Sequence, residues 1–207
     1  MTELMIIDNY DSFTYNLVQL VKKAGVRHFR IVKNDRLLAL KDEFEKVLIS
    51  PGPGVVAEAG QLLPFLKNIY QKSSILGICL GQEALVEFFG GRHVKLPHPL
   101  HGFKNKGKVI RQHYLFEGLP EIFCIGHYHS WVADEGSLST ELNVLMKDEN
   151  GHVMAVSHRK FDIIGLQFHP ESVMTEHGLQ MIGNWLTKKR EAEPTASQRK
   201  PQTKTNV

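Results

Sequence analysis

Cysteine is scarce in this sequence: Cys79 and Cys124 are the only two among 207 residues. Two cysteines are too few for the disulfide framework of a small secreted domain, and they favour a reducing compartment. No apolar run approaches the roughly 20 residues that a membrane-spanning helix needs. The amino terminus lacks a basic segment followed by a long apolar one, so we expect no signal peptide. These absences predict a cytoplasmic protein that does not contact a membrane.

Net charge is also small, with a formal value of +3 for the whole chain. Residues 188–207 hold six Lys or Arg and two Glu, a net of +4, so residues 1–187 sum to −1. The basic segment contains no aromatic residue, and we predict a disordered tail there; a weak contact with an anionic partner is the alternative. A nearly neutral folded part predicts that the protein does not bind nucleic acid.

Short apolar runs alternate with helical patterns in the first half of the chain. Apolar strands separated by helices favour an α/β fold with an open, mostly parallel sheet that carries helices on both faces. The second half is richer in strand patterns, which predicts an antiparallel portion, and residues 1–187 read as one domain. Strands are expected at 4–8, 29–33, 46–50, 74–79, 107–112, 122–128, 130–135, 143–148, 152–158 and 163–168, and helices at 14–25, 62–72, 80–91 and 176–189.

Cys79 lies where a predicted strand should turn into a helix, with Gly77 and Gly81 on either side. This spacing matches a nucleophile elbow that carries cysteine instead of serine. The turn needs residues without side chains because backbone segments approach closely, and it places the sulfur at a helix amino terminus. We therefore expect a reactive thiol with a lowered pKa. The alternative is a small buried cysteine; Cys124 has no such setting and is predicted to lie in the core.

A nucleophilic cysteine needs a base, and the best candidate is in the segment GLQFHPES. His169 ends an apolar run and Glu171 follows two residues later, so both side chains point to the same side of an extended segment. Pro170 favours that extended geometry at His169. Glu171 is therefore expected to hold one imidazole nitrogen while the other faces the sulfur. Taken alone, this pair could also be an ordinary surface pair.

The backbone amide of Leu80, directly after the cysteine, is a natural donor to an oxyanion. The segment Pro51-Gly52-Pro53-Gly54 follows another predicted strand and offers further backbone N–H groups, although such a segment is often a simple turn. It is not a phosphate loop, because no Gly-Lys-Ser/Thr follows it. The histidines are scattered, and residues 93–102 read as a loop, so we predict neither a metal nor a cofactor.

Five segments together resemble the class I (triad) glutamine amidotransferases, and most closely the glutaminase subunits of anthranilate synthase and aminodeoxychorismate synthase. They are IIDNYDSFTYNLVQ, ISPGPG, ILGICLGQEAL, HYHSWV and GLQFHPESVMT, and the resemblance covers residues 4 to about 186. It implies a protein that hydrolyses L-glutamine and passes ammonia to a separate chorismate-binding synthase subunit.

The resemblance assigns roles to individual residues. Cys79 would attack the glutamine side-chain amide to form a thioester, with His169 as base and acid and Glu171 as its orienting partner. Backbone groups of Gly52, Pro53, Gly54 and Leu80 would hold the oxyanion and the substrate. Ser130 and Trp131 would line the glutamine site through backbone contacts.

Two positions depart from the family pattern. Glu83 and Gln82 stand where the family usually has Gln and often His, and His127 stands where it often has Arg. A carboxylate at position 83 cannot donate as an amide does, and it should raise the thiol pKa. Another amidotransferase acceptor, or an impaired regulatory subunit of the same fold, therefore stays open, as does the choice between anthranilate and aminodeoxychorismate.

Overall fold

The structure, a computed structural model, describes residues 4–188 and forms a single nine-stranded sheet in the order β2-β1-β3-β4-β9-β8-β6-β5-β7. The strands are β1 (Leu4–Asp8), β2 (Phe29–Lys33), β3 (Lys46–Ile49), β4 (Ser74–Ile78), β5 (His93–Val109), β6 (Ile122–Ala133), β7 (Leu142–Asp148), β8 (Val153–His158) and β9 (Ile163–Leu166). The α-helices are α1 (Thr14–Lys23), α2 (Leu62–Ile69), α3 (Leu80–Phe88) and α4 (Gly178–Thr187). The predicted α/β class is confirmed.

Five strands, β2, β1, β3, β4 and β9, run parallel to one another. The central ones are short apolar runs in which every residue is buried, as expected for a sheet covered on both faces. Their carboxyl ends meet at one edge of the sheet. That edge is where open α/β folds place their ligands.

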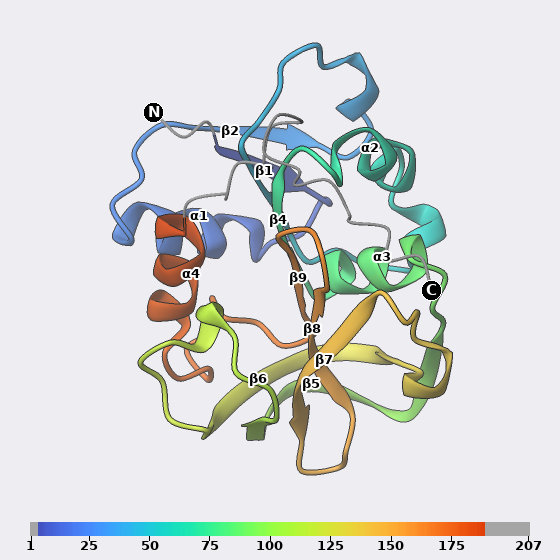
Figure 1. The fold of residues 1–207 in the computed structure, drawn as a ribbon, viewed down its shortest axis with the longest axis vertical. Coiled ribbons are helices and arrows are strands. Elements are labelled where there is room, and N and C mark those ends of the chain that lie inside the picture. Colours follow the sequence, from blue (N-terminus) through green and yellow to red (C-terminus); the bar gives the residue numbers. More distant parts are fainter. Residues whose placement is uncertain (1–3, 189–207) are drawn as a thin grey trace, which may run out of the picture.

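Two helices cover each face of the parallel sheet (Figure 1). Leu4, Ile6 and Leu48 pack on one face in a core shared with α1 and α4. Met5 and Ile7, the alternate residues of β1, pack on the other face with α2 and α3. The alternation of strand side chains thus divides the interior into two cores.

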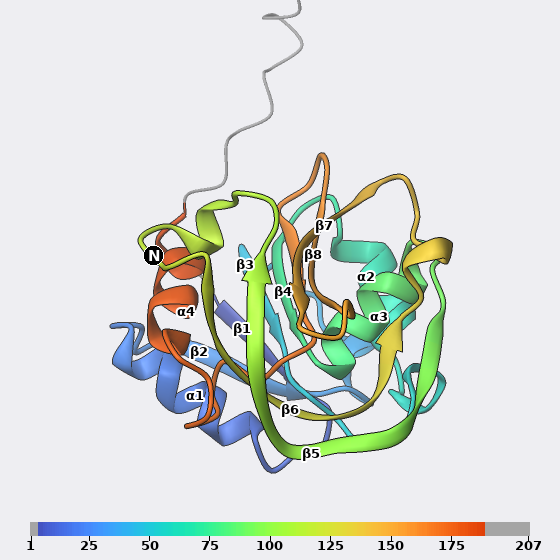
Figure 2. The same cartoon turned by 90° about the horizontal axis from the view of Figure 1, so that it is seen from below.

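The antiparallel portion contains β8, β6, β5 and β7, and β5 curves along one side of the molecule (Figure 2). Two sequence predictions are wrong here. Residues 93–102 belong to β5 instead of forming a loop, and the two strands predicted at 122–128 and 130–135 are one strand, β6. The pairing of β5 with β6 is irregular between Lys95 and Leu100, where Pro97 and Pro99 cannot donate to the ladder.

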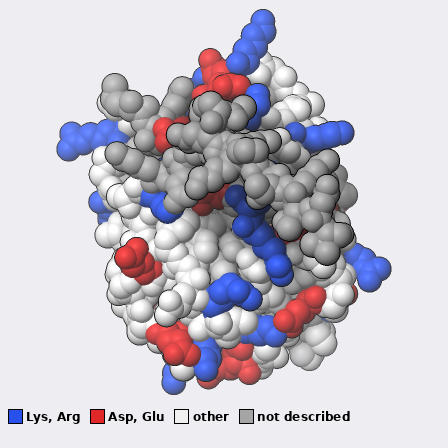
Figure 3. Space-filling model, viewed as in Figure 1, with Lys and Arg blue, Asp and Glu red and all other residues white. Residues whose placement is uncertain are grey.

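Cys124 is half-buried on β6, so its predicted place in the core is wrong. The face seen in Figure 3 carries acidic and basic side chains interspersed. Within residues 4–188 there is no helix long and apolar enough to cross a membrane, and no cluster of three His, Cys, Asp or Glu suited to a metal ion. The predicted basic tail lies outside the described residues apart from Lys188.

Candidate active site

Cys79 forms the sharp corner between β4 and α3. Its backbone has φ 52° and ψ −104°, a conformation that residues with side chains rarely adopt. Its N–H donates to the carbonyl of Leu166 at 2.7 Å, which ties the corner to the end of β9. A strained residue at such a corner is typical of a nucleophile elbow.

The flanking glycines are required by close packing. A Cβ atom at Gly77 would lie 2.5 Å from the backbone carbonyl carbon and oxygen of Gly81, and one at Gly81 would lie 2.8 Å from the carbonyl oxygen of Ile49. Backbone atoms cannot move aside as a flexible side chain could. The glycine spacing seen in the sequence therefore reflects a steric requirement of the turn.

The pKa of the Cys79 thiol is raised well above its usual value, so the expectation of a lowered pKa is wrong for this state of the protein. Burial is the main cause, and the carboxylates of Glu83 and Glu171 raise the pKa further. The hydrogen bond with the Leu80 amide at the start of α3 acts in the predicted direction but is outweighed. A thiol with a raised pKa can act as a nucleophile only if a base removes its proton.

His169 and Glu171 form a buried pair just beyond β9. The imidazole Nδ1 lies 2.7 Å from Glu171 Oε1, the predicted contact, although the segment is a turn and not extended. The other ring nitrogen, Nε2, is buried and has no hydrogen-bond partner in the part of the chain that the structure describes. An oriented imidazole with one uncommitted nitrogen is suited to accept a proton.

Cys79 and His169 follow the carboxyl ends of adjacent parallel strands, because β4 pairs with β9. Gln167, two residues before His169, reaches across this edge: its Nε2 is 3.9 Å from Cys79 Sγ and donates to Glu83 Oε1 at 3.0 Å. Gln82 Nε2 donates to the side-chain carbonyl of Gln167 at 3.0 Å, which fixes the orientation of the Gln167 amide. The amide hydrogens of Gln167 therefore face the thiol and Glu83.

Glu83 is buried behind the sulfur, and its pKa is raised to about 7. Burial is the main cause, and Glu87 raises the pKa further, whereas the hydrogen bond from Gln167 and the charge on His169 lower it. Near neutral pH this side chain is therefore divided between its acid and its carboxylate. The predicted effect of Glu83 on the thiol is confirmed in direction.

The glycine segment after β3 packs directly against Leu80, the residue that follows Cys79. A Cβ atom at Gly52 would lie 2.3 Å from Leu80 Cδ2 and 2.7 Å from Asn9 Cβ. Gly54 has φ 74°, and Pro53 and Gly54 are exposed. The structure thus brings Gly52 beside Leu80, as the sequence predicts, and leaves Pro53 and Gly54 accessible.

Ser130 and Trp131 lie on β6. Earlier residues of this strand contact His169: the Gly126 carbonyl accepts from the His169 N–H at 3.1 Å, and the Tyr128 ring centroid lies 5.0 Å from that of His169. The Trp131 ring contacts the Lys95 ammonium, 5.8 Å from the ring centroid. The glutamine-site assignment of Ser130 and Trp131 stays a prediction.

Three residues that contact the site were not predicted from the sequence: Phe13, Gln167 and Tyr128. Phe13 packs against both His169 and Tyr128, with ring centroids 5.6 and 5.0 Å apart. Gln167 offered one signal, since alternation along an extended segment places it on the same side as His169. Tyr128 and Phe13 gave none, because their proximity depends on how β6 and the loop after β1 meet in three dimensions.

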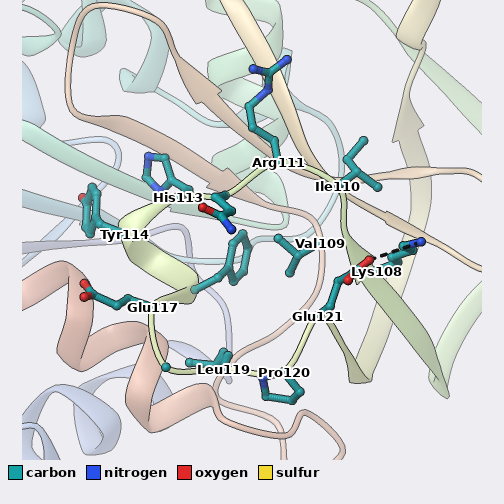
Figure 4. A pocket seen from close by; sticks show the side chains of 13 residues that line it. Lys108, Val109, Ile110, Arg111, His113, Tyr114, Glu117, Leu119, Pro120 and Glu121 are labelled. Carbon is teal, nitrogen blue, oxygen red and sulfur yellow. Dashed lines mark ion pairs between the residues drawn. The ribbon is translucent and has the colours of Figure 1, made fainter.

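A separate open cavity of about 950 Å³ lies away from these residues, in the segment that joins β5 to β6 (Figure 4). It is lined by residues 108–114 and 116–121, and an ion pair between Lys108 and Glu121, 3.3 Å long, lies at its edge. None of the predicted site residues lines this cavity.

Comparisons with known proteins agree with this geometry. The chain matches the family "Glutamine amidotransferase class-I" over residues 5–189. It is 37% identical to anthranilate synthase component 2 of Lactococcus lactis, covering 95% of this chain and all of that protein. It is 36% identical to aminodeoxychorismate synthase component 2 of Escherichia coli K12, covering 88% of this chain and 98% of that protein.

A solved structure shows the same fold. The chain superposes with a TM-score of 0.80 on the crystal structure of a candidate GMP synthase subunit from Thermoplasma acidophilum. The two are 25% identical over 90% of this chain and 92% of the other. The protein belongs to the class I glutamine amidotransferases. Within that class, the similar proteins include second components of two different synthases.

Proposed function

We propose that this protein is the glutaminase subunit of a chorismate-aminating synthase. It hydrolyses glutamine at Cys79 and delivers the ammonia to a separate chorismate-binding subunit. The observation that carries the proposal is the strained, glycine-flanked Cys79 and a buried His169–Glu171 pair after the ends of adjacent strands, in a chain related over most of its length to second components of such synthases. Glutamine is the substrate, and no cofactor takes part.

In the first step, the Cys79 sulfur attacks the side-chain carbonyl carbon of glutamine while His169 Nε2 takes the thiol proton. Glu171 holds Nδ1 and balances the charge that develops on the imidazole. Because burial and two carboxylates raise the thiol pKa, attack and proton removal are coupled instead of starting from a stable thiolate.

The carbonyl oxygen becomes negatively charged in the tetrahedral intermediate and needs hydrogen-bond donors. We assign the Leu80 amide as one donor, because it directly follows the nucleophile at the start of α3. Backbone amides of the segment from Gly52 to Gly54 supply the second, which is supported by the packing of Gly52 against Leu80.

The intermediate collapses when His169 returns its proton to the amide nitrogen, which leaves as ammonia. The product on the enzyme is a γ-glutamyl thioester. A water molecule, deprotonated by His169, then attacks the thioester carbon, and glutamate leaves as the sulfur recovers its proton. Ser130 and Trp131 hold the α-substituents of glutamine through their backbone groups.

The synthase subunit is proposed to dock on the loop after β1. Tyr10 and Tyr15 on this loop and the start of α1 are 52% and 63% exposed, and Phe13 between them reaches His169. Aromatic residues are enriched at protein interfaces. A partner on this loop would therefore cover the catalytic edge of the sheet. The two free cysteines support a cytoplasmic location.

Replacing the nucleophile tests the proposal. Cys79→Ser is expected to abolish glutamine-dependent amination by the assembled synthase, while amination with added ammonium salt continues at the wild-type rate. Cys124→Ser is the matched control and is expected to retain both activities. Full glutaminase activity in Cys79→Ser would show that the mechanism is wrong.

The acceptor is decided by a product assay. The native complex is isolated and supplied with chorismate and glutamine, and the aminated product is identified as anthranilate or aminodeoxychorismate. Both products have related second components at similar identity, so the sequence does not favour one of them. Purification with a synthase that aminates a different acceptor would contradict the chorismate assignment.

A further inference from the structure

A chain of buried polar side chains runs across the antiparallel part of the sheet. His127 and His129 lie on the same side of β6 and are 0% and 3% exposed, and Asn105 of β5 and Asp148 of β7 continue the chain. None of these side chains is one of the proposed catalytic residues Cys79, His169 and Glu171. Buried polar groups at this depth need a complete set of hydrogen bonds.

The contacts are short and link these side chains end to end. Asn105 Nδ2 lies 3.2 Å from Asp148 Oδ2, and Asn105 Oδ1 lies 2.7 Å from His127 Nε2. His127 Nδ1 lies 2.9 Å from His129 Nε2, and His129 Nδ1 lies 2.9 Å from the carbonyl oxygen of Trp131. Both nitrogens of both rings are therefore engaged.

The chemistry at the two ends fixes where hydrogens must be. The Asp148 carboxylate only accepts, so the Asn105 amide nitrogen faces it and the amide oxygen faces His127 Nε2, which must donate. The Trp131 carbonyl also only accepts, so His129 Nδ1 must donate. The central contact between the rings requires one more hydrogen. The pair thus needs three, whereas two neutral imidazoles carry two.

We infer that His127 and His129 share one extra proton across their 2.9 Å contact, and that this protonated pair positions the backbone at Ser130 and Trp131. Without that proton, two nitrogen lone pairs would face each other at the central contact, because the outer contacts commit the other nitrogens. Their repulsion favours uptake of the first proton.

The surroundings of the pair oppose protonation. Burial lowers the pKa of His127 to about 4 and that of His129 to about 3, and the charges of His152 and His169 lower both further, whereas Asp148 raises the pKa of His127. These groups come from the turn after β7, from the segment after β9 and from β7 itself. Burial and the two histidine charges oppose a first proton as well as a second, whereas the hydrogen bonds to Asn105 and Trp131 and the close contact between the two rings favour the first.

The histidine pair lies beside a gap in the β5–β6 ladder, where the backbone needs another hydrogen bond to hold it. Lys95 of β5 pairs with Trp131 and Leu100 pairs with His129, so four residues of β5 lie opposite Ser130 alone. The regular ladder therefore lapses at Ser130. The hydrogen bond from His129 to the Trp131 carbonyl holds the strand at this gap. The link to glutamine binding rests on the proposed role of the Ser130–Trp131 backbone.

Nitrogen NMR of protein with ¹⁵N-labelled histidine measures the proton count directly. At pH 7 the full chain is expected to show three ring N–H groups on His127 and His129, with scalar coupling across the central N–H···N bond. Spectra of His127→Gln and His129→Gln assign the signals, and backbone-to-ring correlations assign them if either variant fails to fold. Two N–H groups, one on each ring, would overturn the inference.

Kinetics separate a positioning role from a structural one. His129→Gln is expected to raise the KM for glutamine about tenfold, the effect of losing one positioning hydrogen bond, and to change kcat by less than about twofold. His101→Gln, at an exposed histidine on the neighbouring strand, is the control with unchanged constants. An unchanged KM in His129→Gln would refute the positioning role.

The two experiments also distinguish this inference from the proposed function. Three N–H groups in a chain that lacks glutaminase activity in its complex would preserve the shared proton and refute the function. Two N–H groups in a chain that is an active glutaminase would refute the shared proton and preserve the proposed function.

Discussion

The two ends of the parallel strands both bury polar side chains, but they satisfy them to different degrees. At the amino ends, the Lys46 ammonium donates to the carbonyls of Trp185 and Lys188, each at 2.9 Å. Ser74 Oγ lies 2.6 Å from Asp162 Oδ2 and accepts from the Trp185 indole at 3.0 Å. This cluster fastens the end of α4 to the sheet.

At the carboxyl ends, the polar groups are left incomplete. Residues 4–188 contain five buried side-chain atoms without a hydrogen-bond partner, and three of them are here: Gln82 Oε1, His169 Nε2 and Glu171 Oε2. Cys79 adds a strained backbone at the same edge. Unsatisfied buried groups and strain cost stability, and they concentrate where a ligand or a reaction completes them.

Buried polar groups therefore have two different roles at the two ends of the parallel strands. The amino ends stabilise the fold, and substitutions there should lower the free energy of unfolding. The carboxyl ends hold the proposed catalytic residues, and substitutions there should lower the rate more than the stability.

His169→Asn should have the largest effect on rate. Loss of the general base is expected to lower the kcat of glutamine hydrolysis by about 10³-fold or more. Ammonium-dependent amination by the synthase is the control and should not change. If thermal unfolding showed that stability fell as steeply as activity, the carboxyl edge would be structural and the comparison would fail.

Lys46→Met should show the opposite pattern. The substitution removes a buried cation that bridges two carbonyls, and we expect unfolding free energy to fall by about 3 kcal/mol. Urea denaturation measures the change. The kcat per folded molecule should stay within about twofold of wild type, because Lys46 lies at the far end of the sheet. A large loss of kcat in folded protein would contradict the division.

Glu83→Gln should have a smaller effect that depends on pH. The folded-state pKa of Glu83 is raised from 4.5 to about 7, so wild-type stability declines as pH rises from about 4.5 and levels off above about 7. The amide does not ionise. We therefore expect Glu83→Gln to be more stable than wild type by about 3 kcal/mol at pH 8 and equal to it near pH 4.

The same variant should make the thiol more reactive, since one of the carboxylates that raise its pKa is removed. The pH dependence of iodoacetamide modification at Cys79 measures this effect, with Cys124 as an internal reference. Glu87→Gln, one turn further along α3, is the matched control and should change the thiol pKa less. An unchanged stability profile and an unchanged thiol pKa would together contradict the assigned protonation of Glu83.

Much of the parallel half could be predicted from the sequence because its strands are continuous apolar runs. The contact between His169 and Glu171 was also predicted, although the extended geometry expected for it is wrong: Pro170 and Glu171 lie in a turn, in which the Ser172 N–H donates to the His169 carbonyl at 3.2 Å. The catalytic roles of His169 and Glu171 stay predictions. Local rules failed for β5, where Pro97 and Pro99 indicate a loop although the flanking residues pair with β6.

The remaining features depend on tertiary contacts that no local pattern reports. The raised pKa of Cys79 follows from burial and from carboxylates on two different elements, which outweigh the helix terminus that the sequence shows. The same holds for Gln167, which joins α3 to the strand beside it. A residue's neighbours across the sheet decided its chemistry in both cases.

Covalent labelling with a thiol-reactive glutamine analogue, read by mass spectrometry on the assembled complex, measures whether Cys79 is a nucleophile that His169 activates. One adduct is expected, on Cys79, that forms rapidly in the wild type, is slowed strongly in His169→Asn and is prevented by excess glutamine. An adduct on Cys124 alone, or labelling of Cys79 at the same rate with and without His169, would contradict this role of Cys79.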